Sequence, residues 1–468
     1  MTHHYTAELA AFVADLRFEA LPSGVVDHAR LLALDTFGCG LLGSRTPWGR
    51  ILLETLREVE GPGDSLVWGT GVRLSAPTAA LVNGTAVHSF ELDDVGPGGH
   101  NGSVALTSAL ALADHFGGVS GKDLITAMVA GIEVAARVQE CVGRKPQVRF
   151  GFHGPGLLGT FGAAAAAAKT LGLNREQVVH ALGHAGQQAA GLMAVQHGGM
   201  GKRLLAGKAA HSGVLAALLA ARSFTNVPNI FEAEYGGFCS AFCGGEGDYD
   251  LGKLVKGLGQ EWFTPRVLFK MWACRVPIHP TLEALRSLRR QHPLPPDEVE
   301  QVTVWLDEGA VKAVGFPWTP TTITSAQLNL AYCCAVFLLE NDVFIDQFRE
   351  EKLADPRFLD LAARVKAVHD PGLDGGPGLG RQARVQVRLR DGTVLMAVGE
   401  VRGGPENPIT RADVEAKFRK LTHGVLDAVG QDRLIAACDR LETLTDSAEL
   451  TALLGIATAK PDAEEVSR

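Results

Sequence analysis

Apolar and small residues recur every three or four positions through the first half of the chain, which is the repeat of a helix that buries one face. Residues 26 to 40 illustrate this spacing: Val26, Ala29, Leu32, Thr36, Phe37 and Gly40. The helical pattern extends from Pro22 to about Leu219. Paired glycines at 117–118 predict the end of a helix over residues 103–116.

Polar residues mark the starts of further helices in this half. Ser120 with Asp123, and Asn174 with Gln177, have the spacing at which a side chain caps the free N–H groups of a new helix. A block of alanines follows at 163–168. Alanine favours helix and has little bulk, so we predict a helix that approaches its neighbours closely.

The pattern changes after about Phe263. Residues 301–306, 383–389 and 393–398 alternate apolar with polar, as half-buried strands do, and Asp-Gly at 391–392 predicts a hairpin between the last two. Glycine- and proline-rich stretches at 370–378 and 403–408 predict loops. Helical patterns return at 411–421 and 432–441.

These patterns predict a mainly α fold. The chain of 468 residues is longer than one core usually supports. We therefore predict a large all-helical domain whose first part is 1–263 and whose C-terminal part is 403–468, with a smaller α+β domain, 264–402, inserted between them.

Composition restricts the partners and the location. The formal charge of -8, from 44 basic and 52 acidic side chains, argues against nucleic acid or an acidic membrane as a partner. Charged residues interrupt the N-terminal apolar positions, so we expect no signal peptide, and no apolar run is expected to span a bilayer. The cysteines are scattered and form no C-x-x-C pair, which favours reduced thiols in a cytoplasmic protein.

Three loops share one arrangement of residues: glycines, an ionisable side chain and the start of a helix. They are ELDDVGPGGHNGS at 91–103, FGFHGPG at 150–156 and QHGGMGK at 196–202, and they carry His100, His153 and Lys202. Glycine lets backbone N–H groups approach a ligand, and a helix N-terminus attracts carboxylate or phosphate. Histidine can exchange a proton near neutral pH. We predict that the loops together bind an anionic substrate that undergoes proton transfer.

Simpler interpretations stay open for each loop. Glycine loops are ordinary connectors, so any one histidine could be structural or solvated. Asp93 and Asp94 point about 100° apart on a helix, so one faces a site while the other caps a helix or lies at the surface. His180 and His184 share a helix face, but without an evident third ligand they favour packed polar residues over zinc. The glycines at 154–159 and 201–208 match neither a dinucleotide nor a nucleotide loop, so no metal and no cofactor are expected.

Several blocks together resemble the MmgE/PrpD family, which includes 2-methylcitrate dehydratases, cis-aconitate decarboxylases and an iminodisuccinate epimerase. The blocks are HSFELDD, GFHGPGLLGTFGAAAAAAKTLGL, GKRLLAGKAAHSGVLAALLAARSF, FKMWACRVPIHPTLEAL and SAQLNLAYCCAVFLL, and the resemblance runs from about residue 8 to 440. It implies a helical domain with a smaller α+β lid, a homodimer, and cofactor-free chemistry on di- and tricarboxylates at the cleft between the domains.

Carried over by position, the resemblance implies catalytic roles for some residues and substrate binding for others. The catalytic residues would be Asp93, His100, His153 and Tyr332; the substrate-binding residues would be Lys202 and Lys270. Removing a proton beside a carboxylate builds negative charge there, which the lysines could stabilise. Which residue is the base and which the acid stays open, and without the resemblance Lys270 reads as a surface charge and Tyr332 as a core aromatic.

The leading hypothesis is a lyase, either a dehydratase or a decarboxylase, acting on a small di- or tricarboxylate. Valine, glycines and a proline stand at 95–99, and Met-Trp-Ala-Cys-Arg follows Lys270, where relatives often differ, so the substrate stays open. An epimerase or isomerase of an iminodisuccinate-like dicarboxylate is the alternative. A non-catalytic carboxylate-binding protein is a further alternative.

Overall fold

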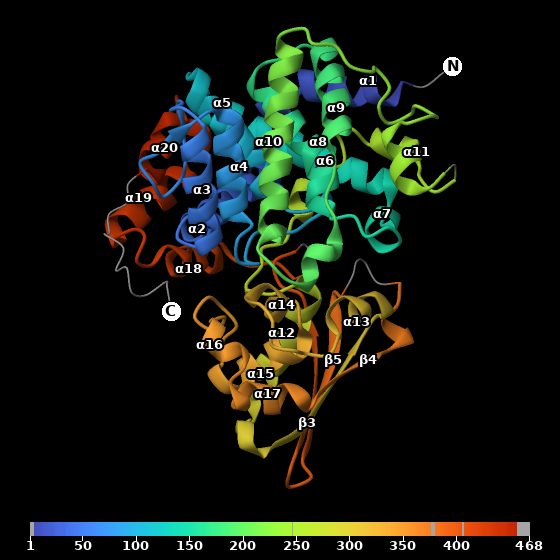
Figure 1. The fold of residues 1–468 in the computed structure, drawn as a ribbon, viewed down its shortest axis with the longest axis vertical. Helices are drawn as coiled ribbons and strands as arrows, with labels where there is room; N and C mark the ends of the chain where they lie inside the picture. The colour runs from blue at the N-terminus through green and yellow to red at the C-terminus, as the bar shows by residue number, and fades with distance from the viewer. Residues whose placement is uncertain (1–3, 246, 376–379, 405–406, 456–468) are drawn as a thin grey trace.

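The computed structural model describes residues 4–455 apart from 246, 376–379 and 405–406. The chain is mainly helical, 59% helix against 9% strand, which confirms the predicted class. Figure 1 shows a large group of helices at the top and a smaller region below it that holds the main sheet.

The large group contains the helices of the first half of the chain. They are α1 (Tyr5–Asp15), α2 (Ser23–Gly43), α3 (Pro47–Val59), α4 (Ala76–Val87), α5 (Thr107–Phe116), α6 (Gly121–Val142), α7 (Lys145–Val148), α8 (Gly154–Thr170), α9 (Arg175–Gln188), α10 (Gly201–Ala221) and α11 (Phe238–Cys243). A short hairpin, β1 (Ser65–Leu66) and β2 (Arg73–Leu74), lies among them. The predicted helical region is therefore confirmed.

Local details of these helices follow from the sequence. Ser120 accepts a hydrogen bond from the Asp123 backbone N–H at the start of α6, and Asn174 and Gln177 form both bonds of a capping box at α9. The predicted helix at 103–116 is present, but its first turn, Gly102–Leu106, is π-helical.

Small residues let α6, α8 and α10 pack closely, as the alanine block predicts. A Cβ added to Gly213 of α10 would lie 2.4 Å from the Ala163 Cβ of α8, so the helices meet where neither has bulk. By length and composition α10 could span a bilayer, contrary to the expectation from the sequence. It packs against α4, α8 and α9, so its apolar surface contacts other helices.

The smaller region is built on a four-stranded sheet of order β4-β3-β5-β6. Its strands are β3 (Val299–Leu306), β4 (Val365–His369), β5 (Gln382–Leu389) and β6 (Val394–Glu400). Its helices are α12 (His279–Gln291), α13 (Glu308–Val314), α14 (Ile323–Gln327), α15 (Leu330–Glu340), α16 (Glu350–Leu353) and α17 (Pro356–Ala363). The predicted strands and the β5–β6 hairpin are confirmed. The loop expected at 370–378 lies partly outside the described residues.

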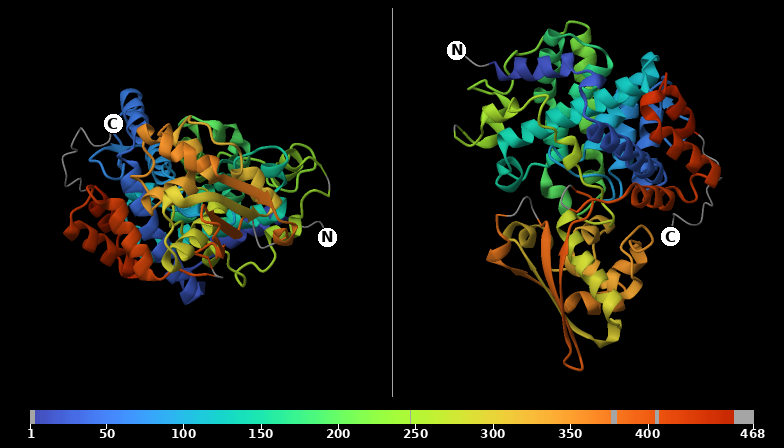
Figure 2. Two further views of the ribbon diagram at one scale, coloured as in Figure 1. Left: turned by 90° about the horizontal axis from the view of Figure 1, so that it is seen from below. Right: turned by 180° about the vertical axis from the view of Figure 1, so that it is seen from behind.

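The chain then returns to the helical group as α18 (Arg411–Thr422), α19 (Ala428–Asp439) and α20 (Ala448–Leu454), the red helices of Figures 1 and 2. Helix α19 begins four residues before the predicted start at 432, because Asp427 caps it by accepting from the Gly430 N–H. Lys417 of α18 forms a buried ion pair with Asp35 of α2, 2.6 Å between Nζ and Oδ1. The C-terminal part of the chain is therefore fixed to the first long helices.

Candidate active site

The loop that follows α4 folds back on itself, so that Asp93 near its start and His100 near its end lie side by side. Backbone hydrogen bonds join Val95 to Leu268 in both directions, at 3.0 and 2.7 Å. Gly96 and Gly99 then close a tight turn in which Gly98 and Gly99 have φ of 87° and 117°, a region that favours glycine. The turn carries His100 back beside Asp93.

Asp93 is the centre of a buried cluster with His88 and His100, which we call the His–Asp–His cluster. Its Oδ2 lies 2.8 Å from His88 Nδ1 and 2.9 Å from His100 Nδ1. The hydrogen bond of His88 suits the tautomer with its proton on Nδ1, which leaves its Nε2 as a base. Both histidines therefore contact the same carboxylate oxygen, His88 through this hydrogen bond and His100 through an ion-pair contact.

Burial and neighbouring charge set the protonation of this cluster. Burial favours a neutral Asp93, but the histidines and Lys270 outweigh it and hold its pKa well below the usual range. Burial lowers the pKa of His88 to about 3, and it lowers the pKa of His100 against the opposing charge of Asp93. At neutral pH the cluster is an ionised carboxylate between two neutral imidazoles.

The side chain of Asp94 bonds to backbone groups instead of the histidines and so stabilises the local fold. Its two carboxylate oxygens accept hydrogen bonds from the backbone N–H groups of Asn101 (2.7 Å) and Gly102 (2.9 Å), at the start of the π-helical turn. Burial and the adjacent Asp93 charge raise its pKa to about 7. Of the two neighbouring aspartates, one therefore faces the histidines and the other caps a helix.

The second loop brings His153 to the same cluster from the N-cap position of α8. Its ring lies 5.9 Å from the His88 ring, and its backbone N–H donates to Gly191 O at 3.0 Å. Its buried Nδ1 has no hydrogen-bond partner among the described residues. Burial and the nearby Lys202 hold the pKa of His153 well below its usual range, so this ring is also neutral.

The third loop brings Lys202 and Arg203 in the first turn of α10, and a distant segment brings Lys270. All three cations meet the carboxylate of Glu91: Lys202 and Arg203 at Oε1, the latter at 2.9 Å, and Lys270 at Oε2 at 3.3 Å. Lys202 Nζ also lies 3.3 Å from His88 Nε2, and Lys270 Nζ lies 3.7 Å from Asp93 Oδ1. We call Glu91 with its three cations the cation cluster; it adjoins the His–Asp–His cluster.

Residues 7–249 match the MmgE/PrpD N-terminal domain, and residues 272–443 match the MmgE/PrpD C-terminal domain. The chain belongs to the MmgE/PrpD family. It is 33% identical to the cis-aconitate decarboxylase-like protein oryM of Aspergillus oryzae, over 96% of this chain and 97% of that protein. It is 30% identical to the cis-aconitate decarboxylase of Aspergillus terreus over 97% of both chains, and 24% identical to the mitochondrial 2-methylcitrate dehydratase of Yarrowia lipolytica over 84% and 78%.

Four of the residues expected from the resemblance to the MmgE/PrpD family lie in these two adjoining clusters: Asp93, His100, Lys202 and Lys270. A fifth, His153, lies beside them, with its ring 5.9 Å from the His88 ring. Tyr332 lies outside both clusters. Its ring packs among Trp318, Phe348 and Phe358 in the sheet region, and its buried hydroxyl has no hydrogen-bond partner among the described residues. Burial raises its pKa above the usual range.

Four members of the site in this MmgE/PrpD chain were not predicted from the sequence. They are His88, Glu91, Arg203 and Gln327. Gln327 accepts a hydrogen bond from Arg203 at 2.6 Å and donates to the backbone oxygens of Phe90 and Ala273. His88 and Glu91 stand in the HSFELDD block beside Asp93, and Arg203 follows Lys202 directly, so adjacency in sequence was the available signal.

The His–Asp–His cluster could also hold a metal ion, because its ligand atoms lie within 4.8 Å of one another. Two histidines and one carboxylate suit several transition metals. Lys202 lies 3.3 Å from His88 and Lys270 lies 3.7 Å from Asp93, so a dication would face two ammonium groups at short range. The residues present therefore fit a metal poorly. His180 and His184 instead bond to the backbone oxygens of Asn226 and Phe224, as packed polar residues do.

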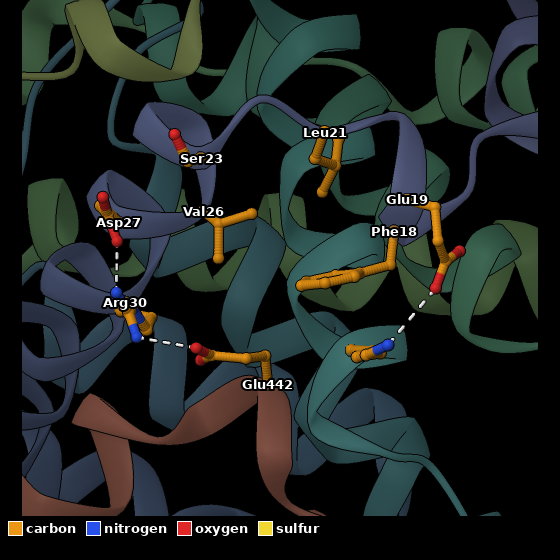
Figure 3. Close-up of a pocket in the computed structure, with 9 residues that line it drawn as sticks. Phe18, Glu19, Leu21, Ser23, Val26, Asp27, Arg30 and Glu442 are labelled. Atoms are coloured by element: carbon orange, nitrogen blue, oxygen red, sulfur yellow. Dashed lines mark hydrogen bonds and ion pairs between the residues drawn. The ribbon is translucent and has the colours of Figure 1, made fainter.

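A surface pocket of this MmgE/PrpD chain lies apart from these clusters, beside the starts of α2 and α6 (Figure 3). Phe18, Leu21 and Val26 line it, with charged residues around them. Both of its cations are paired, Arg30 with Asp27 and Glu442, and Lys122 with Glu19. The pocket shares no residue with the two clusters, and its paired charges offer no free cation to an anion.

Proposed function

We propose that this MmgE/PrpD lyase is a cofactor-independent carboxy-lyase that removes carbon dioxide from cis-aconitate or a closely similar unsaturated tricarboxylate. The observation that carries the proposal is the His–Asp–His cluster buried directly beside the cation cluster. One offers groups that exchange protons and the other offers charges that bind carboxylates. The decarboxylases among the relatives that match nearly the whole chain support the choice of reaction.

The cation cluster supports a substrate with several carboxylates. Lys202, Arg203 and Lys270 carry three positive charges, whereas Glu91 and Asp93 carry two negative charges beside them. A carboxylate of the substrate would receive charge-assisted hydrogen bonds from the lysines in a site that excludes water. Lys202 is 5% exposed and Lys270 is 2% exposed, so these bonds would form at low dielectric.

The chemistry of decarboxylation explains the adjacent histidines. The bond from the CH2 carbon to the departing carboxylate breaks, and its electron pair forms a new double bond to the central carbon. The former double bond then takes up one proton at its far carbon, beside a remaining carboxylate. Negative charge develops at that carboxylate before protonation, where Lys202 and Lys270 would stabilise it. An acid must then deliver the proton to carbon.

We propose His100 as this acid. Its imidazolium form would be stabilised by Asp93 at 2.9 Å, whereas no ion pair joins His153 to a carboxylate among the described residues. His88 also contacts Asp93, but its ring is fully buried and its Nε2 already faces Lys202. His153 would bind the substrate through its unpartnered nitrogen. Tyr332 remains a proposed catalytic residue, and a Tyr332→Phe variant tests this role.

Dehydration is the second candidate. The support for it is the likeness to 2-methylcitrate dehydratases, at lower identity and over less of the chain than the decarboxylases. In that reaction a base removes a proton beside a carboxylate and an acid protonates the departing hydroxyl. The same residues could act as this base and this acid, so the substrate that is turned over decides between dehydration and decarboxylation.

We also propose that residues 264–402 act as a lid, that the enzyme is a homodimer, and that it is cytoplasmic. The two connections to the sheet region lie side by side, since Phe269 N–H donates to Gly403 O at 3.3 Å. This arrangement would suit a hinge, and the burial of the clusters requires some opening for a substrate to enter.

The test uses purified protein freed of metal, in deuterated buffer, with cis-aconitate, citrate, 2-methylcitrate and iminodisuccinate followed separately by proton NMR. We expect cis-aconitate to lose carbon dioxide and the product to carry one deuterium on carbon. Loss of water from 2-methylcitrate with cis-aconitate unchanged would establish the dehydratase instead. Four unchanged substrates would refute both.

A further inference from the structure

Glu91 is the residue on which the cations of the site converge, yet the proposed reaction gives it no chemical step. Its carboxylate contacts Lys202, Arg203 and Lys270, and its side chain is almost completely buried. The first two cations belong to α10, whereas Lys270 lies on the segment that leads to the sheet region. One carboxylate therefore holds together cations from two distant parts of the chain.

The backbone at Glu91 shows that this position is enforced. Its φ is 55°, in the left-handed region that residues other than glycine rarely adopt. Such a conformation persists where surrounding contacts determine it, and it is concentrated at functional sites. Lys202, Lys270 and Arg203 also keep the carboxylate ionised, since they hold its pKa well below the usual range against the effect of burial.

The charge of the two adjoining clusters follows from this ionised carboxylate. With the histidines neutral, the three cations exceed Glu91 and Asp93 by one positive charge. A neutral residue at 91 would leave an excess of two. Each additional charge acts more strongly on a trianion than on a dianion, so the residue at 91 affects which anion is preferred.

We propose that Glu91 positions Lys202 and Lys270 and limits the positive charge of the site, and so determines how strongly the enzyme prefers tricarboxylates over dicarboxylates. The inference rests on the proposed function in one respect, that the ligand is a polycarboxylate. Glu91 acts through the lysines, so it is a positioning and specificity-determining residue.

The pH dependence gives an independent readout. Burial lowers the pKa of Lys202 to about 8, and Glu91 opposes this lowering. Removing the Glu91 charge would lower the pKa further, so anion binding would weaken at a lower pH than in the parent. The titratable and charged groups that face Lys202 from the surrounding elements are Glu91, Arg203, Lys270, His88, His100 and His153.

The experiment compares Glu91→Gln with the parent by calorimetry, using tricarballylate as a saturated tricarboxylate and succinate as a dicarboxylate. We expect the ratio of the two affinities to rise about tenfold or more in favour of tricarballylate. This factor corresponds to the lower end of the coupling energies found between close charges. The alkaline limit of binding should also move to lower pH. An unchanged ratio, within about twofold, in a folded variant would overturn the proposal.

The matched control is Glu133→Gln, which removes another buried carboxylate. Glu133 accepts hydrogen bonds from Phe263 N–H and Thr264 N–H, outside both clusters, so its substitution should leave the ratio unchanged. If Glu91→Gln does not fold, Glu91→Asp decides. This variant keeps the charge but shortens the side chain, so both affinities should fall with the ratio preserved, whereas unchanged affinities would overturn the proposal.

The outcome is separate from that of the proposed function. If the parent turns over no polycarboxylate but Glu91→Gln still shifts the binding ratio, the decarboxylase proposal fails and the inference about Glu91 stands. If the parent decarboxylates cis-aconitate and the binding ratio does not change, the decarboxylase proposal stands and the inference about Glu91 fails.

Discussion

Replacing Asp93 with asparagine should abolish most of the activity while leaving substrate binding intact. The carboxylate Oδ2 contacts both His88 Nδ1 and His100 Nδ1. Because both rings contact the same oxygen, an asparagine side chain would place either its amide oxygen or its amide nitrogen against both of them. It also lacks the charge that stabilises a protonated His100, which is the form that the proposed mechanism needs.

The magnitude follows from the geometry. A unit charge at about 4 Å contributes ~4 kcal/mol at an effective dielectric constant of about 20, which corresponds to roughly three powers of ten in rate. We expect kcat for cis-aconitate to fall about 10³-fold. The KM should stay the same or decrease, because the cation cluster is retained and the site becomes more positive.

The assay follows product formation by proton NMR under saturating cis-aconitate, with binding measured separately by calorimetry. Asp94→Asn is the matched control, because Asp94 accepts hydrogen bonds from backbone N–H groups and, within the described part of the chain, forms no hydrogen bond or ion pair with either histidine. Its rate should stay within about tenfold of the parent. A parental rate in Asp93→Asn, or equal losses in the two variants, would refute the assignment of Asp93 as the residue that orients the histidines.

Four further predictions concern the stability of the fold and the metal content and protonation of the site. The folded-state pKa of Asp94 is raised from 3.8 to about 7, so the stabilisation by its protonated form is complete below pH 3.8 and is lost as the pH rises through 7. The Tm of Asp94→Asn should therefore improve relative to the parent over this range. A Tm difference between the two proteins that stays constant with pH would contradict the raised pKa. Gly207→Ala should lower the free energy of unfolding by about 2 kcal/mol, since a Cβ would lie 2.2 Å from Leu81 O, whereas Gly24→Ala, with open space around it, serves as the control in urea unfolding. Treatment with a chelator should leave turnover unchanged, and a loss restored by a divalent ion would make the His–Asp–His cluster a metal centre. Calorimetry of tricarballylate binding in buffers of different ionisation enthalpy should show proton uptake near neutral pH, and its absence would argue against a substrate-induced change in histidine protonation.

Much of the fold was predictable because its signals are local. The apolar repeat of α2, the capping pairs at α6 and α9, and the Asp-Gly turn between β5 and β6 each act over a few residues. Strand β4 was missed, and its pairing explains why. It is a short, half-exposed edge strand whose partner, β3, lies about sixty residues earlier in the chain and runs parallel to it.

The site was predictable where an ionisable residue stands at the start of a helix, as for His153 and Lys202. It was not predictable where a role depends on distant partners. In the sequence, nothing distinguishes Glu91 from other acidic residues. Its role becomes visible only in the structure, where Lys270, 179 positions later, contacts its carboxylate. The likeness of the three loops indicated an anion site, but the sequence carried no sign that a glutamate of the chain would already contact all three cations.

The electrostatics of the two clusters explain how a proton donor could be available when the reaction needs it. Burial lowers the pKa of His100, and Lys270 and Lys202 add to this lowering while Asp93 opposes it. A substrate carboxylate bound to the two lysines would offset their repulsion and add negative charge beside the ring. The pKa of His100 would then rise, so the imidazolium would form together with the substrate complex. Because the same lysines would bind the substrate and suppress the protonation of His100, a single binding event would both position the carboxylates and supply the acid.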